Sequence, residues 1–136
     1  MYETFEHTAD LGLRIRADNL NSLFAEAGRA LFSVIVENPE DIRTVEEIPF
    51  TINGTEAEDL LHDWLTELLF TFHVHRRVLA KFDVHIHSTE LTAVAQGEKI
   101  DPKRHEINLE IKAITWHGLK IEQSPDGWMA EVIVDI

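Results

Sequence analysis

Apolar and polar residues alternate with a period of two along much of this 136-residue chain, a spacing that is typical of half-buried strands. The segments that follow this pattern, and that we expect to be extended, are residues 2–7, 11–17, 45–52, 80–87, 91–98, 107–113, 119–123 and 128–135. Between the last two, Pro125 fixes φ and Gly127 supplies a left-handed residue for the turn. The pattern predicts hairpins and roughly seven strands in all.

Two further segments show a helical period. From about Asn21, apolar residues recur at spacings of one, three and four as far as residue 34, and Asn21 or Ser22 is the expected N-cap. A second helix is expected where Thr55 and Glu58 have the spacing of a capping box, and its broad apolar stripe covers residues 60–72.

The order of these elements predicts the fold class. Most of the strands follow one another without an intervening helix, which favours antiparallel pairing over a doubly wound parallel sheet. We therefore expect an α+β fold that forms a single domain over residues 1–136, with a mostly antiparallel sheet and two main helices packed on one face.

Composition narrows the possible functions. Twelve Lys and Arg residues against 25 Asp and Glu residues give a net charge of −13, which disfavours direct binding of duplex nucleic acid because phosphate would be repelled. The absence of cysteine excludes thiol catalysis and cysteine-based zinc sites. No apolar run approaches the ~20 residues of a membrane span, and the first residues lack the features of a secretory signal, so we expect a cytoplasmic protein.

Histidine pairs offer one candidate metal site. His73 and His75 form one His-x-His pair, and His85 and His87 form another, a spacing that on a strand places both imidazoles on one face and suits zinc. The sequence nominates no third or fourth ligand. The favoured interpretation is therefore that the first pair ends the second helix and that the second pair lies on a solvated strand face.

Carboxylates offer another candidate. Asp10 follows the first strand, and Asp135 immediately precedes Ile136, whose terminal carboxylate is a further oxygen donor. These oxygens together would suit calcium, magnesium or manganese. The alternative is that Asp10 caps a turn and Asp135 is an exposed strand end.

Several blocks carry a resemblance that covers nearly the whole chain: His7-Thr8-Ala9-Asp10, the helix from Asp59 to Leu69, the stretch from Arg104 and His105 through Glu110 to His117, and the ending Val132 to Ile136. Together they resemble the archease family. The resemblance implies an accessory protein rather than an enzyme. Such a protein activates an RtcB-type RNA ligase in tRNA splicing or RNA repair, by promoting the metal- and GTP-dependent guanylylation of the ligase and its multiple turnover.

The resemblance also implies site residues. It implies a divalent metal, calcium in the first place with magnesium or manganese as alternatives, held by Asp10, Asp135 and Ile136. It makes Lys112, His105 and His7 candidates for contact with the ligase or its nucleotide, and Lys112 is expected to be exposed. For His105, as for Asp59 and His117, a purely structural role is the open alternative.

Two other classes of function remain open at this point. One is a chaperone-like protein-interaction module whose metal site is structural and whose acidic surface docks to a basic partner. The other is a metal-dependent hydrolase, although the sequence offers no recognisable general base. No GxGxxG, GK[ST], GxSxG or HExxH motif is present, so no standard enzyme class is indicated.

Overall fold

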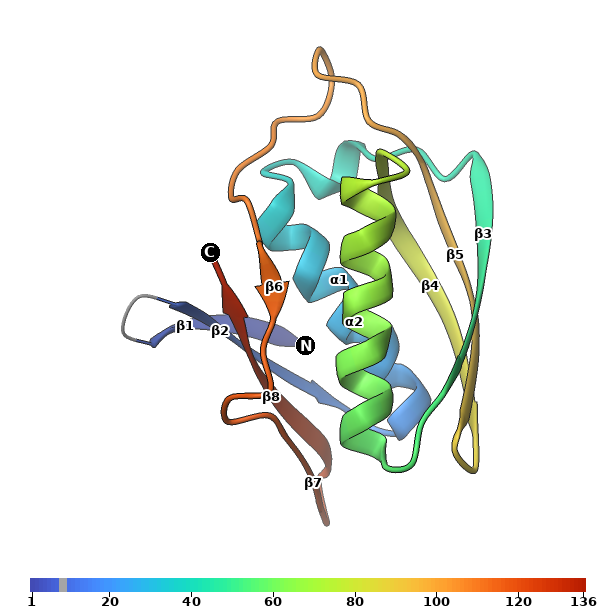
Figure 1. The fold of residues 1–136 in the computed structure, drawn as a ribbon, viewed down its shortest axis with the longest axis vertical. Coiled ribbons are helices and arrows are strands. Elements are labelled where there is room, and N and C mark those ends of the chain that lie inside the picture. Colours follow the sequence, from blue (N-terminus) through green and yellow to red (C-terminus); the bar gives the residue numbers. More distant parts are fainter. Residues whose placement is uncertain (8–9) are drawn as a thin grey trace.

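The computed structural model describes residues 1–7 and 10–136, and its elements follow one another as strands interrupted by two long helices (Figure 1). The helices are α1 (Leu20–Ile35) and α2 (Ala57–His73), with a short 3-10 helix η1 (Pro39–Asp41) between them. The strands are β1 (Tyr2–His7), β2 (Asp10–Ala17), β3 (Glu46–Asn53), β4 (Arg77–His87), β5 (Glu90–Lys99), β6 (Ala113–Ile114), β7 (Lys120–Ser124) and β8 (Gly127–Asp135).

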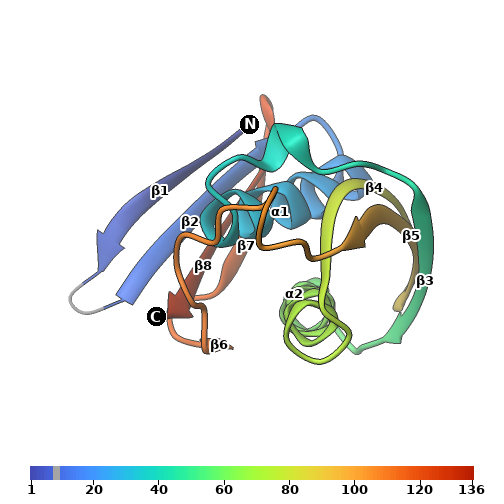
Figure 2. The same ribbon diagram turned by 90° about the horizontal axis from the view of Figure 1, so that it is seen from above.

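The strands form two antiparallel sheets with the two helices between them (Figures 1 and 2). The larger sheet has the order β1-β2-β8-β6, and β7 pairs with β8 on the same side as β6. The smaller sheet has the order β3-β5-β4. The expected α+β class, with antiparallel pairing and two main helices, is confirmed, but the strands form two sheets where the sequence suggested one.

The reason for two sheets lies in α1. Its buried residues include Leu23, Phe24, Ala27, Leu31 and Ile35 and cover most of its circumference. A helix that is apolar on more than one side must be covered on more than one side. It accordingly packs against β2 of the larger sheet and β4 of the smaller one. None of the described helices is long and apolar enough to cross a membrane.

The core between the sheets is centred on aromatic side chains. Trp64 of α2 is fully buried, and its indole N–H donates a 2.9 Å hydrogen bond to the carbonyl of Phe24 in α1. Phe50 of β3 lies edge-on to Trp64 at 5.3 Å between ring centroids, and Phe32 stacks on Phe82 of β4 at 6.1 Å. These contacts join both helices to the smaller sheet.

Both predicted helix caps are wrong in detail. The N-cap of α1 is Asn19, whose side chain accepts a 2.8 Å hydrogen bond from the Ser22 N–H, while Asn21 accepts one from Ile86 at 2.9 Å. At α2, the N-cap Glu56 makes no side-chain capping bond, and the Thr55 hydroxyl instead bonds to Asp59. The side chains near each helix start therefore form hydrogen bonds that their spacing in the sequence does not predict.

The predicted strand over residues 107–113 is also wrong, because only Ala113–Ile114 pairs as a strand. The Asn108 N–H instead donates to the carbonyl of Ile35 at 2.8 Å, in the last turn of α1. The segment therefore satisfies carbonyls that the end of a helix leaves free. Its alternating apolar residues pack beside a helix end rather than on a sheet.

Gly97 of β5 permits the close approach of β4. A Cβ added to Gly97 would overlap the backbone carbonyl oxygen of Val78, whereas one added to Gly12 would meet only the ring of Phe5, which can rotate away. Backbone atoms cannot move aside as a side chain can.

We expect Gly97→Ala to lower the free energy of unfolding by about 2 kcal/mol and Gly12→Ala by about 1 kcal/mol or less, measured by urea titration. Equal losses in the two variants would contradict this explanation.

Candidate functional site

The two predicted carboxylate ligands lie at the same end of the larger sheet. β2 and β8 are antiparallel neighbours, with Leu11 opposite Val134. Continuing this register by one residue sets Asp10 opposite Asp135, and directly opposed residues on antiparallel strands have Cα atoms about 4.5–5.5 Å apart. The strand pairing therefore brings together residues separated by almost the whole chain.

Both carboxylates belong to the sheet face that is turned away from the helices. Val132 and Val134 are fully buried in the core, so the alternate residues of β8, including Asp135, face outward. Leu13 and Ile15 of β2 are likewise buried, which places Asp10 on the outer face. The two side chains therefore share one face as well as one end of the sheet.

The chain end is fixed beside them. The side chain of Ile136 packs against the core, and the carbonyl of Asp135 accepts a 2.7 Å hydrogen bond from the Lys112 N–H. Ala113 is the partner of Asp135 in the pairing of β6 with β8. The terminal carboxylate and the exposed side chain of Lys112 therefore belong to the same corner, which we call the carboxylate corner and define as Asp10, Asp135, Ile136 and Lys112.

His7 borders this corner. It is the β1 partner of Asp10 in the β1–β2 pairing, and its ring lies edge-on to that of His117 at 5.3 Å between centroids. Its Nδ1 is buried and has no hydrogen-bond partner among the described residues. Thr8 and Ala9, the middle of the predicted His7 to Asp10 block, lie outside the described residues.

The donors of the corner suit a hard cation. Carboxylate oxygens are the ligands preferred by calcium, magnesium and manganese. Within residues 1–7 and 10–136, however, no three His, Asp or Glu side chains are grouped so as to hold a metal. The candidate set is therefore two carboxylate side chains and the terminal carboxylate, with no third side chain from the described residues.

Comparison with known proteins gives this corner a context. The sequence matches the Archease protein family (MTH1598/TM1083) over residues 2–136. The chain belongs to the archease family. It is 43% identical to protein archease of Pyrococcus abyssi, covering 99% of this chain and 98% of that protein. It is 36% identical to protein archease of Methanopyrus kandleri, with 99% of both chains covered.

A solved structure shows the same fold. The solution structure of Methanobacterium thermoautotrophicum protein 1598 superposes with a TM-score of 0.86 at 33% sequence identity, and the match covers 99% of this chain and 98% of that one. The resemblance to the archease family that the sequence blocks indicate is thus confirmed by family, relatives and fold.

His105 lies apart from the carboxylate corner of this archease-family chain. It is 2% exposed, its Nδ1 accepts a 2.8 Å hydrogen bond from the Asp101 N–H, and its Nε2 lies 2.9 Å from Glu98 Oε2. Because Nδ1 accepts, the ring proton is on Nε2 and is donated to Glu98. Of the two roles considered for His105, this geometry supports the structural one, which ties the loop after β5 to the sheet.

Glu98 is the centre of that buried network. Burial alone would raise the pKa of Glu98, but hydrogen bonds from the Arg43 N–H, the Arg104 guanidinium and His105 outweigh it and hold the pKa at about 2. Glu98 is therefore ionised at neutral pH although it is only 8% exposed. The sequence pattern does not predict this network. Glu98 lies at the end of β5, and the alternation of apolar and polar residues along that strand does not indicate that its carboxylate is buried.

The remaining polar candidates lie elsewhere. His73 lies in the last turn of α2, and its Nε2 lies 2.8 Å from the carbonyl of Ile111, so it holds the segment between β5 and β6 against the helix end. His85 and His87 are exposed on β4, and His85 lies 3.2 Å from Asp83. Both observations agree with the favoured interpretation of the histidine pairs. Asp59 contacts Thr55 at the start of α2.

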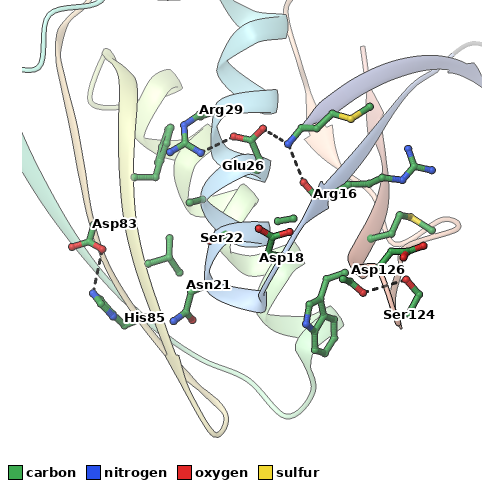
Figure 3. A pocket seen from close by; sticks show the side chains of 18 residues that line it. Arg16, Asp18, Asn21, Ser22, Glu26, Arg29, Asp83, His85, Ser124 and Asp126 are labelled. Atoms are coloured by element: carbon green, nitrogen blue, oxygen red, sulfur yellow. Dashed lines mark hydrogen bonds and ion pairs between the residues drawn. The ribbon is translucent and has the colours of Figure 1, made fainter.

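A hollow of about 880 Å³ opens at the opposite end of β2 from the carboxylate corner (Figure 3). Asp18 lines it, together with the start of α1 and residues of β4 such as His85. Since β2 runs from Asp10 at one end to Ala17 at the other, Asp18 does not extend the corner. The hollow and the corner are separate features.

Sequence reasoning missed one aromatic contact near the corner. Trp116 follows β6, and its ring stacks on that of His62 in α2 at 3.7 Å between centroids and 11° between planes. Trp116 lies in the family-like block that ends at His117, and nothing in that block predicts its contact with α2. No local sequence signal predicts this pair, because residues 62 and 116 are far apart in the sequence and meet only in the folded chain.

Proposed function

We propose that this chain is an accessory protein that activates an RtcB-type RNA ligase, by promoting the metal- and GTP-dependent guanylylation of the ligase and so its multiple turnover in tRNA splicing or RNA repair. Membership in the archease family supports the coarser part of this proposal, an accessory role in RNA processing. The observation that carries the finer part is the convergence of Asp10, Asp135 and the chain end at one corner of the sheet. The predicted cytoplasmic location belongs to the same proposal.

The proposed metal site is the carboxylate corner. Asp10, Asp135 and the terminal carboxylate of Ile136 would hold the ion, with calcium first and magnesium or manganese as alternatives. Three negative groups at one corner repel one another, and this repulsion is relieved when a cation joins them. A bound divalent ion would supply positive charge for the phosphate oxygens of a nucleotide. The outward orientation of Asp10 and Asp135 gives a partner protein access to that ion.

Lys112 is proposed to contact the ligase or its nucleotide. Its side chain is exposed, while its backbone N–H is fixed by the 2.7 Å hydrogen bond to the Asp135 carbonyl. The ammonium group is a compact positive charge on an otherwise acidic protein. At the corner it would attract phosphate or a carboxylate of the ligase, and the His7 ring beside Asp10 would contact the same partner.

The acidic surface is consistent with a complex in which the ligase, and not this chain, binds the RNA. With a net charge of −13, the chain would be repelled by RNA phosphates. The ligase would therefore hold the RNA and the GTP. The chain would bind the ligase and stabilise the state in which the metal is loaded, because a partner can shift an equilibrium only toward the state that it binds better.

The test is a guanylylation assay with a purified cognate ligase. Labelled GTP is incubated with the ligase, with and without this chain, across calcium, magnesium and manganese, and ligation is followed over many turnovers. We expect the chain to raise the guanylylation rate by at least 10-fold, about 1.4 kcal/mol in the barrier, and to allow repeated turnover. An unchanged rate in every metal would refute the proposal.

The same assay separates the alternatives. A chaperone-like module with a structural metal would raise the soluble yield of the ligase without a GTP-dependent gain in rate. A metal-dependent hydrolase would release product from a phosphoester with no ligase present. Stimulation that requires the ligase, GTP and a divalent metal together supports the accessory role alone.

A further inference from the structure

Trp116 is exposed and yet held in place. Its side chain leaves 55% of the residue open to solvent, while the stack on His62 covers one face of the ring. An exposed tryptophan is costly in water, and large exposed aromatic residues that are held in one orientation are typical of binding surfaces. The open ring face is therefore available to a partner.

The support beneath the ring is rigid. His62 Nε2 lies 3.0 Å from the carbonyl of Ile114, and its Nδ1 lies 3.2 Å from Asp63 Oδ1. Both partners are acceptors, so a neutral ring donates to one of them, and either bond holds the ring in place. The Thr115 hydroxyl donates a 2.9 Å hydrogen bond to the Ile133 carbonyl, which ties the loop to β8. A ring that is already ordered loses little entropy on binding.

The Trp116 loop is continuous with the carboxylate corner. Its next residue, His117, contacts the ring of His7 at 5.3 Å, and His7 is paired with Asp10. The Thr115 bond to Ile133 lies two residues from Asp135 along β8. A partner that covers the open face of Trp116 would therefore also meet the corner.

The charges around the ring point to a cationic partner. Asp63 has 46% of its side chain exposed, and Asp59 precedes His62 by one turn on the same face of α2. The face of an indole ring attracts cations, best of all an arginine guanidinium that can also bond to carboxylates, whereas a nucleotide would bring phosphates toward these acidic groups.

We propose that Trp116 and His62 form a docking platform for an arginine-bearing surface of the RNA ligase. This inference rests on the proposed function for the identity of the partner. The platform supplies affinity, and the neighbouring corner supplies the activation. Loss of the platform should therefore weaken the complex without changing what the complex does once it has formed.

The experiment measures the dissociation constant of the complex with the cognate ligase by calorimetry, and the guanylylation rate at saturating chain. The variants are Trp116→Ala, the conservative Trp116→Tyr and the matched control Phe70→Ala, which removes an exposed aromatic at the far end of α2 that is 49% exposed. We expect Trp116→Ala to raise the dissociation constant at least 10-fold and to keep the saturated rate. Trp116→Tyr and Phe70→Ala should each stay within about 3-fold of the parent chain.

Any of four outcomes would overturn the inference. Trp116→Ala could bind the ligase as tightly as the parent chain, the Phe70→Ala control could lose as much affinity, or the parent chain could fail to bind the ligase at all. A Trp116→Ala loss seen instead in binding to single-stranded RNA or GTP alone would also overturn it, in favour of base stacking. If the parent chain binds through Trp116 but leaves guanylylation unchanged, the platform is supported and the proposed function fails.

Discussion

Replacement of Asp135 by asparagine should abolish activation of the ligase while the fold persists. The variant removes one of the two carboxylate side chains at the carboxylate corner, and loss of a group that holds or orients a metal typically costs at least 10- to 100-fold in metal affinity or activity. Asparagine has the same shape, and the backbone hydrogen bond from Lys112 to the Asp135 carbonyl does not depend on the side chain. We expect the stimulated guanylylation rate to fall to that of the ligase alone, a loss of at least 10-fold.

The measurement has two readouts on the same preparations. Single-turnover guanylylation reports activation, and calorimetric titration of the chain alone with calcium or manganese reports binding of the ion. Asp126→Asn is the matched control, since Asp126 is an exposed carboxylate in the turn between β7 and β8, lining the hollow of Figure 3. Retained activation in Asp135→Asn would refute the role of the corner. Lost ion binding with retained activation would show that the metal is structural.

The strands of the carboxylate corner could be predicted from the sequence, but their neighbours could not. Alternation along β2 and β8 identified both as half-buried strands, and the structure confirms them. Nothing in a period of two says that β2 pairs with β8 rather than with another strand, because the pairing joins residues more than a hundred positions apart. The convergence of Asp10 and Asp135 was expected from the family resemblance and from their suitability as oxygen ligands of one divalent cation, and the register of β2 and β8 now gives it a geometric basis.

The errors arose where tertiary partners outweigh local pattern. The alternation over residues 107–113 looked like a strand, but its amide groups bond to the last turn of α1. Thr55 has the spacing of a capping residue, but its hydroxyl bonds to Asp59. His105 lies in a family-like block, and its buried bond to Glu98 depends on a loop geometry that no spacing rule contains. Local periodicity predicts which face of an element is apolar, but it does not predict which other element that face packs against.

The buried network of Glu98 should be the most sensitive polar site for stability. Glu98→Ala leaves the Arg43 N–H and the Nε2–H of His105 without their acceptor, and it removes one of the two ion-pair partners of Arg104, the other being Asp101 at 3.7 Å. Removal of one partner from a buried charged pair costs about 3–5 kcal/mol. We expect a loss of that size in urea titration at pH 7. The control Glu47→Ala removes an exposed carboxylate that accepts a 3.3 Å hydrogen bond from the Gln96 side chain, and it should cost less than about 0.5 kcal/mol.

Acid provides an independent check of the same network, because the pKa of Glu98 is about 2 in the folded chain, below its ordinary value of 4.5. A carboxylate whose pKa is lowered by folding stabilises the folded state above its unfolded pKa, and this contribution is lost as the pH falls toward the folded pKa. The parent chain should therefore lose stability between about pH 5 and pH 2.

Glu26 and Glu131 also have lowered pKa values, because hydrogen bonds to cationic groups outweigh the opposing effect of burial. They therefore add to the same loss of stability in the parent chain and in Glu98→Ala. The difference between the parent chain and Glu98→Ala isolates Glu98, and it should shrink as the pH is lowered; a constant difference from pH 7 to pH 3 would mean that Glu98 acts through packing rather than charge.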